Sequence, residues 1–400
     1  MNTLYITDLD GTLLEDDQTL STDTIKMINR LIEEGVMITY ATARSYLTAS
    51  KVTQPLHFKL PVIVQNGTFI DTPEGEEVIG HYLDTSILDT LKDEDVSPIV
   101  YSKDKEIHFS YLKDSTNKGI HYFLDTHLND PRKNPVENYQ ALYQEGIYYV
   151  LLIDEYDKLL PLYNKLKEDY HVILDQDLYS HEWWLEIMNK EASKATAIET
   201  LKRKMQCDEV IVFGDGKNDL EMFEKAEHSV AVSNADDCLK EHADEIIYKS
   251  VAEYIWRKEH MIYPALIEDL ETVYRYICIL ENKEIDKDYF KQAYLKGLED
   301  ENTFYFLHEH GFISMHITNY LHHDHPTGEV VELVVDPEYR SQKIGEQLLN
   351  YIEELGEELG LEEICLCTST YRKQAHKFYE RHGYIMNHYN YIKKLNCFFE

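Results

Sequence analysis

The chain has 400 residues, with 39 Lys and Arg against 74 Asp and Glu, so its formal net charge is −35 at pH 7 and binding to a nucleic-acid backbone, which needs clustered positive charge, is disfavoured. Its length exceeds what one hydrophobic core usually supports, which predicts two or three domains. The 6 cysteines lack C-x-x-C or zinc-type spacing, no signal-peptide pattern is recognised, and no uncharged apolar run reaches membrane-spanning length, so we expect a soluble cytoplasmic protein without a membrane partner.

Strands and helices alternate in the first part of the chain, and the alternation returns near residue 192. Ser21 is a suitable N-cap for the first helix. Strands that alternate with helices indicate βαβ units and a parallel sheet covered on both faces. The predicted strands are 4–7, 36–40, 62–64, 210–213 and 229–232, and the predicted helices are 21–34, 45–52, 192–205 and 218–225.

A different composition separates the two halves of this pattern. Residues 82–184 are rich in Tyr and acidic side chains and carry strand and helix patterns of their own. We therefore predict a Rossmann-like α/β core, built from 1–81 and 185–255, that is interrupted by an inserted α/β cap at 82–184. A separate α+β domain is predicted for 256–400.

Two carboxylates follow the first predicted strand directly, in the segment Asp8-Leu9-Asp10-Gly11-Thr12. Buried carboxylates at the end of a strand are costly unless a cation or a substrate compensates their charge. This end of parallel strands is where open α/β sheets bind ligands, and Gly11 permits a turn whose amides face a phosphate. One carboxylate can attack phosphorus while its neighbour handles the proton of the leaving group, which predicts phosphoryl transfer.

Further segments carry groups suited to a phosphate and to a cation. Thr42 ends the second strand with a hydroxyl that precedes helix-initiating amides, and Lys194 at a predicted helix start offers a point charge. Asp215 and Asp219 follow another strand and add carboxylates at the same edge of the sheet. Hard oxygen ligands in this arrangement favour Mg²⁺.

In this order the segments resemble the haloacid dehalogenase-like superfamily, and specifically its Cof-type phosphatases, over about residues 1–255. The resemblance implies that Asp8 is a nucleophile forming an aspartyl-phosphate and that Asp10 is the general acid and base. It also implies a small phosphorylated metabolite as substrate, selected by the cap. Ala43 stands where glycine is usual in the family. The implied Mg²⁺ ligands are Asp8, the main-chain oxygen of Asp10, and Asp215, with Asp219 in support, and the residues implied around the phosphate or substrate are Gly11, Thr42, Ala43, Arg44, Asn66, Lys194 and Asn218.

A second motif follows a predicted buried strand at 330–335. The next residues form a loop and then a helix that starts near Ile344, with apolar side chains at helical spacing. The free amides of such a loop and helix start suit an anion, here a pyrophosphate. Downstream, residues 371–384 are predicted to form a helix that carries an aromatic pair and ends at a glycine. An amphipathic helix that packs on the core would have the same pattern.

Together these segments resemble the GNAT acetyltransferase family over about residues 260–395. The resemblance implies acetyl-CoA as acyl donor, an unidentified amine as acceptor, and Tyr379 as the general acid that protonates the thiolate. Glu332 on the central strand is the candidate for deprotonating the amine, although a strand glutamate is as often structural. Lys343 replaces the first glycine of the family's loop. The implied acetyl-CoA contacts are Val334, Val335, Arg340, Gln342, Lys343, Ile344, Gly345, Glu346, Arg372 and Tyr379.

The two resemblances predict a bifunctional enzyme, a Mg²⁺-dependent phosphatase fused to an N-acetyltransferase. In the alternatives, the C-terminal domain is a non-catalytic acetyl-CoA sensor or a partner-docking module. Acetyl-CoA alters phosphatase kinetics only if the domains are coupled, and a CoA ester should not stabilise a pure docking module.

Overall fold

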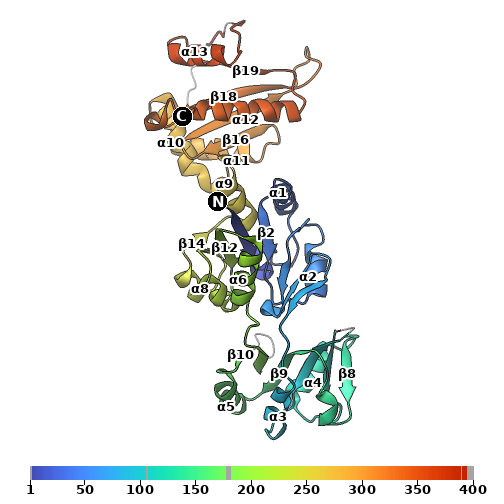
Figure 1. Cartoon of the computed structure of the whole chain (residues 1–400). Coiled ribbons are helices and arrows are strands. Elements are labelled where there is room, and N and C mark those ends of the chain that lie inside the picture. Colours follow the sequence, from blue (N-terminus) through green and yellow to red (C-terminus); the bar gives the residue numbers. More distant parts are fainter. Residues whose placement is uncertain (1, 105–106, 177–181, 389, 394–400) are drawn as a thin grey trace. The chain divides into compact units, whose positions relative to one another are not determined.

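The structure, a computed structural model, describes residues 2–104, 107–176, 182–388 and 390–393. The chain divides into an N-terminal unit, Met1–Trp256, and a C-terminal unit, Arg257–Glu400 (Figure 1). None of the helices in the described ranges combines the length and the apolar content needed to cross a bilayer.

A parallel sheet forms the core of the N-terminal unit. Its strands are β1 (Thr3–Thr7), β2 (Met37–Tyr40), β12 (Glu209–Gly214), β13 (His228–Val232) and β14 (Glu245–Ile247). They lie in the order β14-β13-β12-β1-β2, and every neighbouring pair is parallel. Leu4 and Ile6 of β1 are buried, as expected for an apolar run in a sheet that is covered on both faces. The predicted parallel sheet is therefore confirmed.

The helices of the core include the four predicted ones and two further ones. They are α1 (Thr22–Glu33), α2 (Tyr46–Thr53), α6 (Lys194–Met205), α7 (Leu220–Phe223), α8 (Asp237–His242) and α9 (Val251–Glu259), of which α8 and α9 were not predicted. α1 begins after Ser21, as predicted, because the Ser21 hydroxyl accepts a hydrogen bond from the Thr24 amide at 3.1 Å. The helix predicted at 218–225 is shorter, since the chain first makes a tight turn at Lys217–Asp219.

A small antiparallel sheet follows β2 in the chain and contains β3 (Val62–Val64), β4 (Phe69–Asp71) and β5 (Glu77–Gly80). The parallel sheet and β3 are joined by the single bridge between Ala41 and Ile63. The strand predicted at 62–64 is thus present, but it pairs mainly with β4.

The inserted segment forms a 6-stranded sheet in the order β10-β11-β9-β6-β7-β8. The predicted end of the cap at residue 184 falls inside β11, which stays paired with β9 and β10 beyond that residue. α3 and α5 pack on one apolar cluster of this sheet and α4 on another. The elements are β6 (Ile99–Lys103), β7 (Ile107–Leu112), β8 (Lys133–Val136), β9 (Ile147–Asp154), β10 (Tyr170–Gln176) and β11 (Trp183–Asn189), with α3 (Ser86–Lys92), α4 (Lys118–Thr126) and α5 (Tyr156–Leu166).

Asp71 ends β4 with an unusual buried carboxyl group. Its exposed fraction is 3%, and its Oδ1 has no hydrogen-bond partner within the described ranges. Burial raises the pKa of Asp71 to about 6; Lys103 opposes this rise and Glu77 adds to it. Because the folded chain holds this proton more tightly than the unfolded chain, Asp71 destabilises the fold as the pH rises from about 4 to about 6, and the penalty is constant above that.

We therefore expect Asp71→Asn to stabilise the N-terminal unit by up to about 3 kcal/mol near pH 7.5 and by about half as much near pH 5. Thermal melting at the two pH values measures the difference. Asp114→Asn, at an exposed turn residue, is the matched control and should change little at either pH. An equal gain for Asp71→Asn at both pH values would contradict the assignment.

The C-terminal unit is a 5-stranded sheet in the order β15-β16-β17-β18-β19, with helices on both faces. Neighbouring residues of β17 face opposite cores: Phe312 packs in the cluster of α10 and α11, and Ile313 packs in the cluster of α12. This confirms the predicted α+β class. The elements are β15 (Ile262–Pro264), β16 (Thr303–His308), β17 (Gly311–Thr318), β18 (Thr327–Val335) and β19 (Ile364–Leu366), with α10 (Leu270–Glu281), α11 (Lys287–Leu298), α12 (Ile344–Glu358) and α13 (Lys373–Arg381).

Candidate functional site

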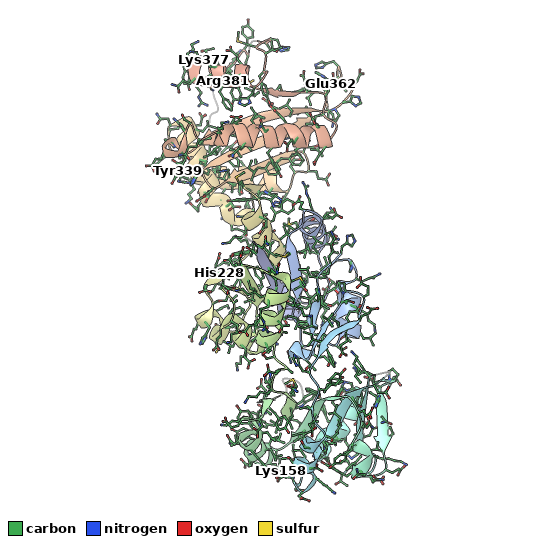
Figure 2. All side chains as sticks on the ribbon, in the orientation of Figure 1. Lys158, His228, Tyr339, Glu362, Lys377 and Arg381 are labelled. Carbon is green, nitrogen blue, oxygen red and sulfur yellow. The ribbon has the colours of Figure 1, made fainter. Side chains whose placement is uncertain are left out.

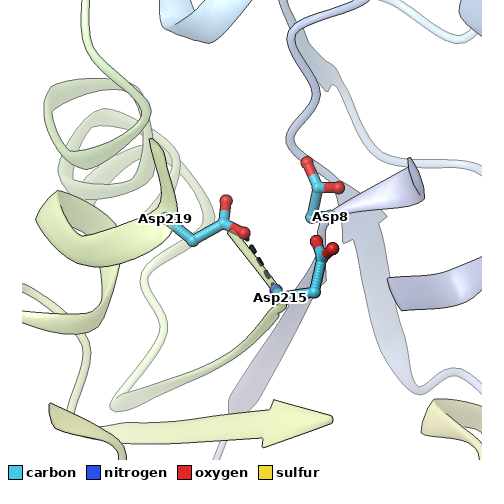
Figure 3. A group of neighbouring side chains, drawn as sticks. All are labelled: Asp8, Asp215 and Asp219. Carbon is cyan, nitrogen blue, oxygen red and sulfur yellow. Dashed lines mark hydrogen bonds between the residues drawn. The ribbon is translucent and has the colours of Figure 1, made fainter. Parts of the chain in front are cut away.

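Carboxylates from separate segments meet at the C-terminal edge of the parallel sheet. Asp8 follows β1 and Asp215 follows β12, and the register pairs Thr7 with Phe213, so both segments leave the sheet side by side. Asp219 comes from the turn after β12. Each of Asp8, Asp215 and Asp219 offers a carboxylate oxygen within 4.8 Å of the others (Figure 3). The predicted convergence of these side chains is therefore present.

Lys194 joins this group from the first turn of α6. Its Nζ donates to Asp8 Oδ1 at 2.5 Å and to Asp219 Oδ1 at 2.7 Å, and the residue is only 2% exposed. Burial lowers the pKa of the Lys194 ammonium, but the carboxylates of Asp8 and Asp219 outweigh it and raise the pKa above its ordinary value. The ammonium consequently stays charged between these carboxylates.

Main-chain amides and a hydroxyl hold the acidic side chains in place. Asp219 Oδ2 accepts hydrogen bonds from the amides of Asp215 at 3.1 Å and Gly216 at 3.2 Å, the first of which is drawn in Figure 3. The Thr12 hydroxyl donates to Asp215 Oδ1 at 3.1 Å. Gly11 has φ +72°, and a Cβ there would lie 2.2 Å from Asp215 Oδ2. Only glycine therefore allows the close approach of this loop to Asp215.

The acidic group carries more negative charge than Lys194 balances. Burial raises the pKa of Asp8 to about 7; Lys194 lowers it, and Asp219 and Asp215 raise it. Burial also raises the pKa of Asp215. Clustered carboxylate oxygens with an unbalanced charge fit a divalent cation, and Mg²⁺ prefers such ligands. The side chains of Asp8, Asp215 and Asp219 therefore fit the predicted Mg²⁺.

Asp10 is turned away from this group. Arg44 Nε donates to Asp10 Oδ2 at 2.7 Å, and Arg44 Nη2 donates to Asp10 Oδ1, which makes a two-point ion pair. Arg44 Nη2 also donates to Gln18 Oε1 at 3.1 Å. The Asp10 carboxylate therefore does not belong to the three-carboxylate group, and the implied metal contact through its main-chain oxygen stays a prediction. A carboxylate rotamer depends on such long-range partners, which a motif does not specify.

The other residues implied around the phosphate lie on the segments that follow β2, β3 and β12. Thr42 is buried, and its Oγ1 accepts a hydrogen bond from the Arg44 amide at 3.1 Å. The Asn66 amide donates to the Thr42 carbonyl at 3.0 Å, which brings the segment after β3 beside the one after β2. Ala43 and Asn218 are exposed, so a methyl group at residue 43 is accommodated.

Sequence reasoning did not select Gln65 or Thr12 as site residues. The main-chain amide of Gln65 donates to the Arg44 carbonyl at 2.9 Å. Its side-chain Nε2 donates to the hydroxyl of Tyr148 on β9 at 3.4 Å. Thr12 lies in the same short motif as Asp8, and this position in the sequence could have identified it as a site residue. Gln65 directly precedes Asn66, one of the implied substrate contacts, but its own partners come from distant segments that the local sequence does not reveal.

In the C-terminal unit, β18 and β19 pair over only part of the length of β18. Gly328, Glu329 and Val330 pair with β19, whereas the following residues of β18 pair with β17 alone. The main chain of Val334 and Val335 is therefore not paired with β19, as the implied contact with a pantetheine arm requires.

A pocket of about 560 Å³ lies where β18 and β19 are no longer paired. It is lined by the end of α10 and the segment after it, by β18, and by the segment after β19. Arg372 Nη2 donates to the Leu280 carbonyl at 2.9 Å and lies 3.4 Å from Glu281 Oε1, so Arg372, implied as an acetyl-CoA contact, lines this pocket. The charged lining residues are Glu281, Lys283, Glu284, Asp286, Glu332 and Arg372.

Glu332 reaches the pocket from β18 and is half-buried. Burial raises the pKa of its carboxyl group, the hydrogen bond from the Ser314 hydroxyl lowers it, and Glu281 raises it. A raised pKa suits a group that takes up a proton near neutral pH. Tyr379 lies half-buried on α13, where burial raises the pKa of its hydroxyl.

The loop before α12 contains two residues in the left-handed backbone region. Tyr339, which is labelled in Figure 2, lies at the start of this loop. Its ring stacks on that of His310, with ring centroids 3.5 Å apart. Ser341 and Lys343 have φ values of 67° and 66°. Arg340 and Gln342 are exposed. The remaining implied contacts lie in the first turn of α12, namely Ile344, Gly345 and Glu346.

Lys343 occupies a left-handed backbone conformation that glycine adopts at lower cost. We expect Lys343→Gly to stabilise the C-terminal unit by about 0.5–1 kcal/mol and to raise its melting temperature by about 2 °C, since relief of strain exceeds the added freedom of the unfolded chain. Lys291→Gly, at an exposed residue inside α11, is the matched control and should cost about 1 kcal/mol. Equal destabilisation by both variants would contradict the expectation.

The two units of the chain match different families of known proteins. Residues 5–255 match the haloacid dehalogenase-like hydrolase family, and residues 263–384 match the acetyltransferase (GNAT) family. The C-terminal part is similar to the aminoalkylphosphonate N-acetyltransferase of Salmonella typhimurium, with 40% identity over 136 residues that make up 33% of this chain and 88% of that protein.

The N-terminal part is similar to a 5-amino-6-(5-phospho-D-ribitylamino)uracil phosphatase of Bacillus subtilis, with 27% identity over 249 residues that cover 60% of this chain and 90% of that protein. It is also 25% identical over 245 residues to the HMP-PP phosphatase of Serratia proteamaculans, covering 57% of this chain and 82% of that protein. A crystal structure from Thermotoga maritima with 25% identity has a TM-score of 0.52 and covers 64% of this chain and 97% of that one. The chain therefore belongs to the haloacid dehalogenase-like hydrolase family, and its C-terminal part belongs to the GNAT acetyltransferase family.

Proposed function

We propose that the N-terminal unit is a Mg²⁺-dependent phosphatase of small phosphorylated metabolites that works through an aspartyl-phosphate on Asp8. The observation that carries this proposal is the meeting of Asp8, Asp215 and Asp219 around Lys194 at the edge of the parallel sheet. The family membership supports the reaction class, and two relatives are named as phosphatases of phosphorylated metabolites.

In the proposed first step, a carboxylate oxygen of Asp8 forms a bond to phosphorus while the bond from phosphorus to the ester oxygen breaks. Asp10, once it is protonated and one of its two contacts with Arg44 is released, gives the proton to that leaving oxygen. It then takes a proton from the water that hydrolyses the aspartyl-phosphate, which restores Asp8 and releases phosphate. Lys194 favours the ionised form of Asp8, and with Thr42 it would hold the phosphate oxygens. A bound Mg²⁺ would supply charge that offsets the carboxylates and the phosphate.

Arg44 has a positioning role in this proposal. Its two-point contact fixes the orientation of the Asp10 carboxylate. The inserted cap is proposed to select the substrate, since it is the segment that contacts the core through Gln65 and Tyr148.

For the C-terminal unit, we propose N-acetyl transfer from acetyl-CoA to a small amine. Main-chain groups of Val334 and Val335 would hold the pantetheine arm, and amides of the loop up to Glu346 would hold the pyrophosphate. The amine nitrogen forms a bond to the acetyl carbon as the carbon–sulfur bond breaks. Glu332 accepts the proton of the amine, and Tyr379 gives a proton to the leaving thiolate.

The charges of the 560 Å³ pocket support an acceptor that carries both an amine and an anionic group. Glu281, Glu284 and Glu332 suit the ammonium form of the amine, and Arg372 suits an anion. The relative named as an aminoalkylphosphonate N-acetyltransferase supports this class, since such a molecule has both groups.

One observation favours the alternative in which the C-terminal unit senses acetyl-CoA without acetylating an amine. Lys343 adopts φ 66° at a position where the family usually has glycine, and its side chain adds bulk to the loop. A change in phosphatase kinetics with acetyl-CoA, together with no acetylated product, would support this alternative.

The test uses the full chain. Phosphate release is measured from a panel of phosphorylated metabolites with Mg²⁺ and with EDTA, and acetyl transfer is measured with acetyl-CoA and 2-aminoethylphosphonate. We expect Mg²⁺-dependent release from at least one ester, a thermal shift with acetyl-CoA, and an acetylated product. No release from any ester would defeat the phosphatase proposal, and no thermal shift with acetyl-CoA would defeat the acetyltransferase and sensor proposals together.

A further inference from the structure

The turn Gln65–Gly67 after β3 has a rare backbone conformation. Gln65, Asn66 and Gly67 follow one another with φ values of 50°, 53° and 88°, all in the left-handed region. Residues with a side chain seldom adopt this region, and outside helix ends they do so where the surrounding structure holds them. Two of these consecutive residues are not glycine, so the conformation calls for an explanation.

Segments of the proposed phosphate site hold this turn. The main-chain amide of Gln65 donates to the Arg44 carbonyl at 2.9 Å, and the main-chain amide of Asn66 donates to the Thr42 carbonyl at 3.0 Å. At Gly67, a Cβ would lie 2.1 Å from the carbonyl oxygen of Ser193, the residue before Lys194. The turn Gln65–Gly67 therefore packs between the Thr42–Arg44 segment and the start of α6.

Polar side-chain atoms of the same turn are buried without a partner. Gln65 Oε1, Asn66 Oδ1 and Thr68 Oγ1 accept no hydrogen bond from any residue in the described part of the chain. Buried polar atoms are nearly always paired, because leaving them unpaired forfeits their hydration. A ligand that donates hydrogen bonds would satisfy these three atoms, which lie within four consecutive residues.

The location of these atoms identifies the part of the ligand that they meet. Gln65 lies beside Arg44, which holds Asp10, and its Nε2 reaches the Tyr148 hydroxyl of the inserted cap at 3.4 Å. Tyr148 is itself held by an edge contact with Phe69, with ring centroids 5.0 Å apart. In the proposed reaction Asp10 protonates the leaving oxygen, so the alcohol part of the substrate lies on this side of Asp8.

We propose that Gln65, Asn66 and Thr68 form a leaving-group subsite that selects phosphate monoesters whose alcohol part carries further hydroxyl or amino groups. This inference rests on the proposed phosphatase function. The amide oxygens of Gln65 and Asn66 only accept hydrogen bonds, so they favour groups that donate them. An aromatic leaving group without donors leaves these oxygens unpaired and gains nothing from the subsite.

The test compares Gln65→Leu with the wild-type full chain on two kinds of ester. 4-Nitrophenyl phosphate has no donor in its leaving group, whereas ribose 5-phosphate, glucose 6-phosphate and glycerol 3-phosphate have several. We expect kcat/KM for the best hydroxylated ester to fall by about tenfold or more, and kcat/KM for 4-nitrophenyl phosphate to change by less than about threefold. Gln206→Leu is the matched control, since Gln206 also has a left-handed φ of 56° but is exposed at the end of α6.

Thr68→Val provides a second, independent readout. Valine has nearly the shape of threonine but removes the unpaired hydroxyl, so we expect this variant to melt at a higher temperature than wild type while losing activity on the hydroxylated ester. A residue with only a structural role would not combine a gain in stability with a selective loss of activity.

Three results would overturn the subsite: an equal loss on all esters for Gln65→Leu, no loss on any ester, or wild-type protein that hydrolyses 4-nitrophenyl phosphate and none of the hydroxylated esters. Wild-type protein inactive on every ester, 4-nitrophenyl phosphate included, would instead defeat the phosphatase proposal itself and the subsite with it.

Discussion

Asp8→Asn is expected to lower phosphate release by at least about a thousandfold, because a neutral amide cannot attack phosphorus and form the proposed aspartyl-phosphate. The substitution also removes one oxygen ligand from the group of Asp8, Asp215 and Asp219. Stabilisation of the chain by Mg²⁺ in a thermal melt should therefore weaken in the same variant. The measurement is kcat on the best ester of the panel, with the melting temperature in EDTA as the test of folding.

The matched control is Asp16→Asn, which makes the same chemical change at an exposed residue of the same N-terminal segment. This control should retain full activity, and acetyl transfer by the C-terminal unit should be the same in both variants. Phosphate release by Asp8→Asn at the wild-type rate would show that another group is the nucleophile.

Lys194→Met is expected to destabilise the N-terminal unit by about 3–5 kcal/mol, which corresponds to a fall of about 10 °C in melting temperature. The ammonium contacts Asp8 at 2.5 Å and Asp219 at 2.7 Å, so its removal leaves buried carboxylates without their cation. Since Lys194 lowers the pKa of Asp8, the variant should bind a proton at Asp8 at still higher pH than wild type. The deficit in stability should therefore be largest above neutral pH and shrink as the pH falls.

A divalent cation can replace part of the missing charge, so Mg²⁺ should stabilise Lys194→Met more than wild type in the same melt. Lys202→Met is the matched control from the same helix, where the ion pair with Glu227 is at the surface and contributes at most about 1 kcal/mol. A similar, pH-independent loss in both variants would contradict the central role given to Lys194.

The pairing of Asp10 with Arg44 gives the proposed acid and base a defined orientation before substrate binds. Guanidinium and carboxylate form a planar two-point contact, which restrains the carboxylate more than one hydrogen bond does. The proposed function assigns the metal to one side of the sheet edge, with Asp8, Asp215 and Asp219, and the leaving group to the other side, with Asp10, Arg44 and Gln65.

The sequence by itself determined those features that depend on residues close together in the chain. Ser21 caps α1 through a bond to Thr24, three residues on, and the apolar run of β1 is buried in the parallel sheet as predicted. The alternation of strands and helices specified that the ends of parallel strands share one edge, so the meeting of Asp8 with Asp215 followed from the order of elements. The spacing of motifs was enough to identify both families.

Only the tertiary structure decided how side chains from distant segments pair. Asp10 faces Arg44 rather than the other carboxylates, and Arg372 donates to the Leu280 carbonyl at the end of α10. β11 runs past residue 184, the predicted end of the cap, because its pairing with β9 and β10 continues there. The physical reason is common to these cases: a rotamer or a strand end is set by the groups that pack against it, and those groups are brought together by the fold and not by the local sequence.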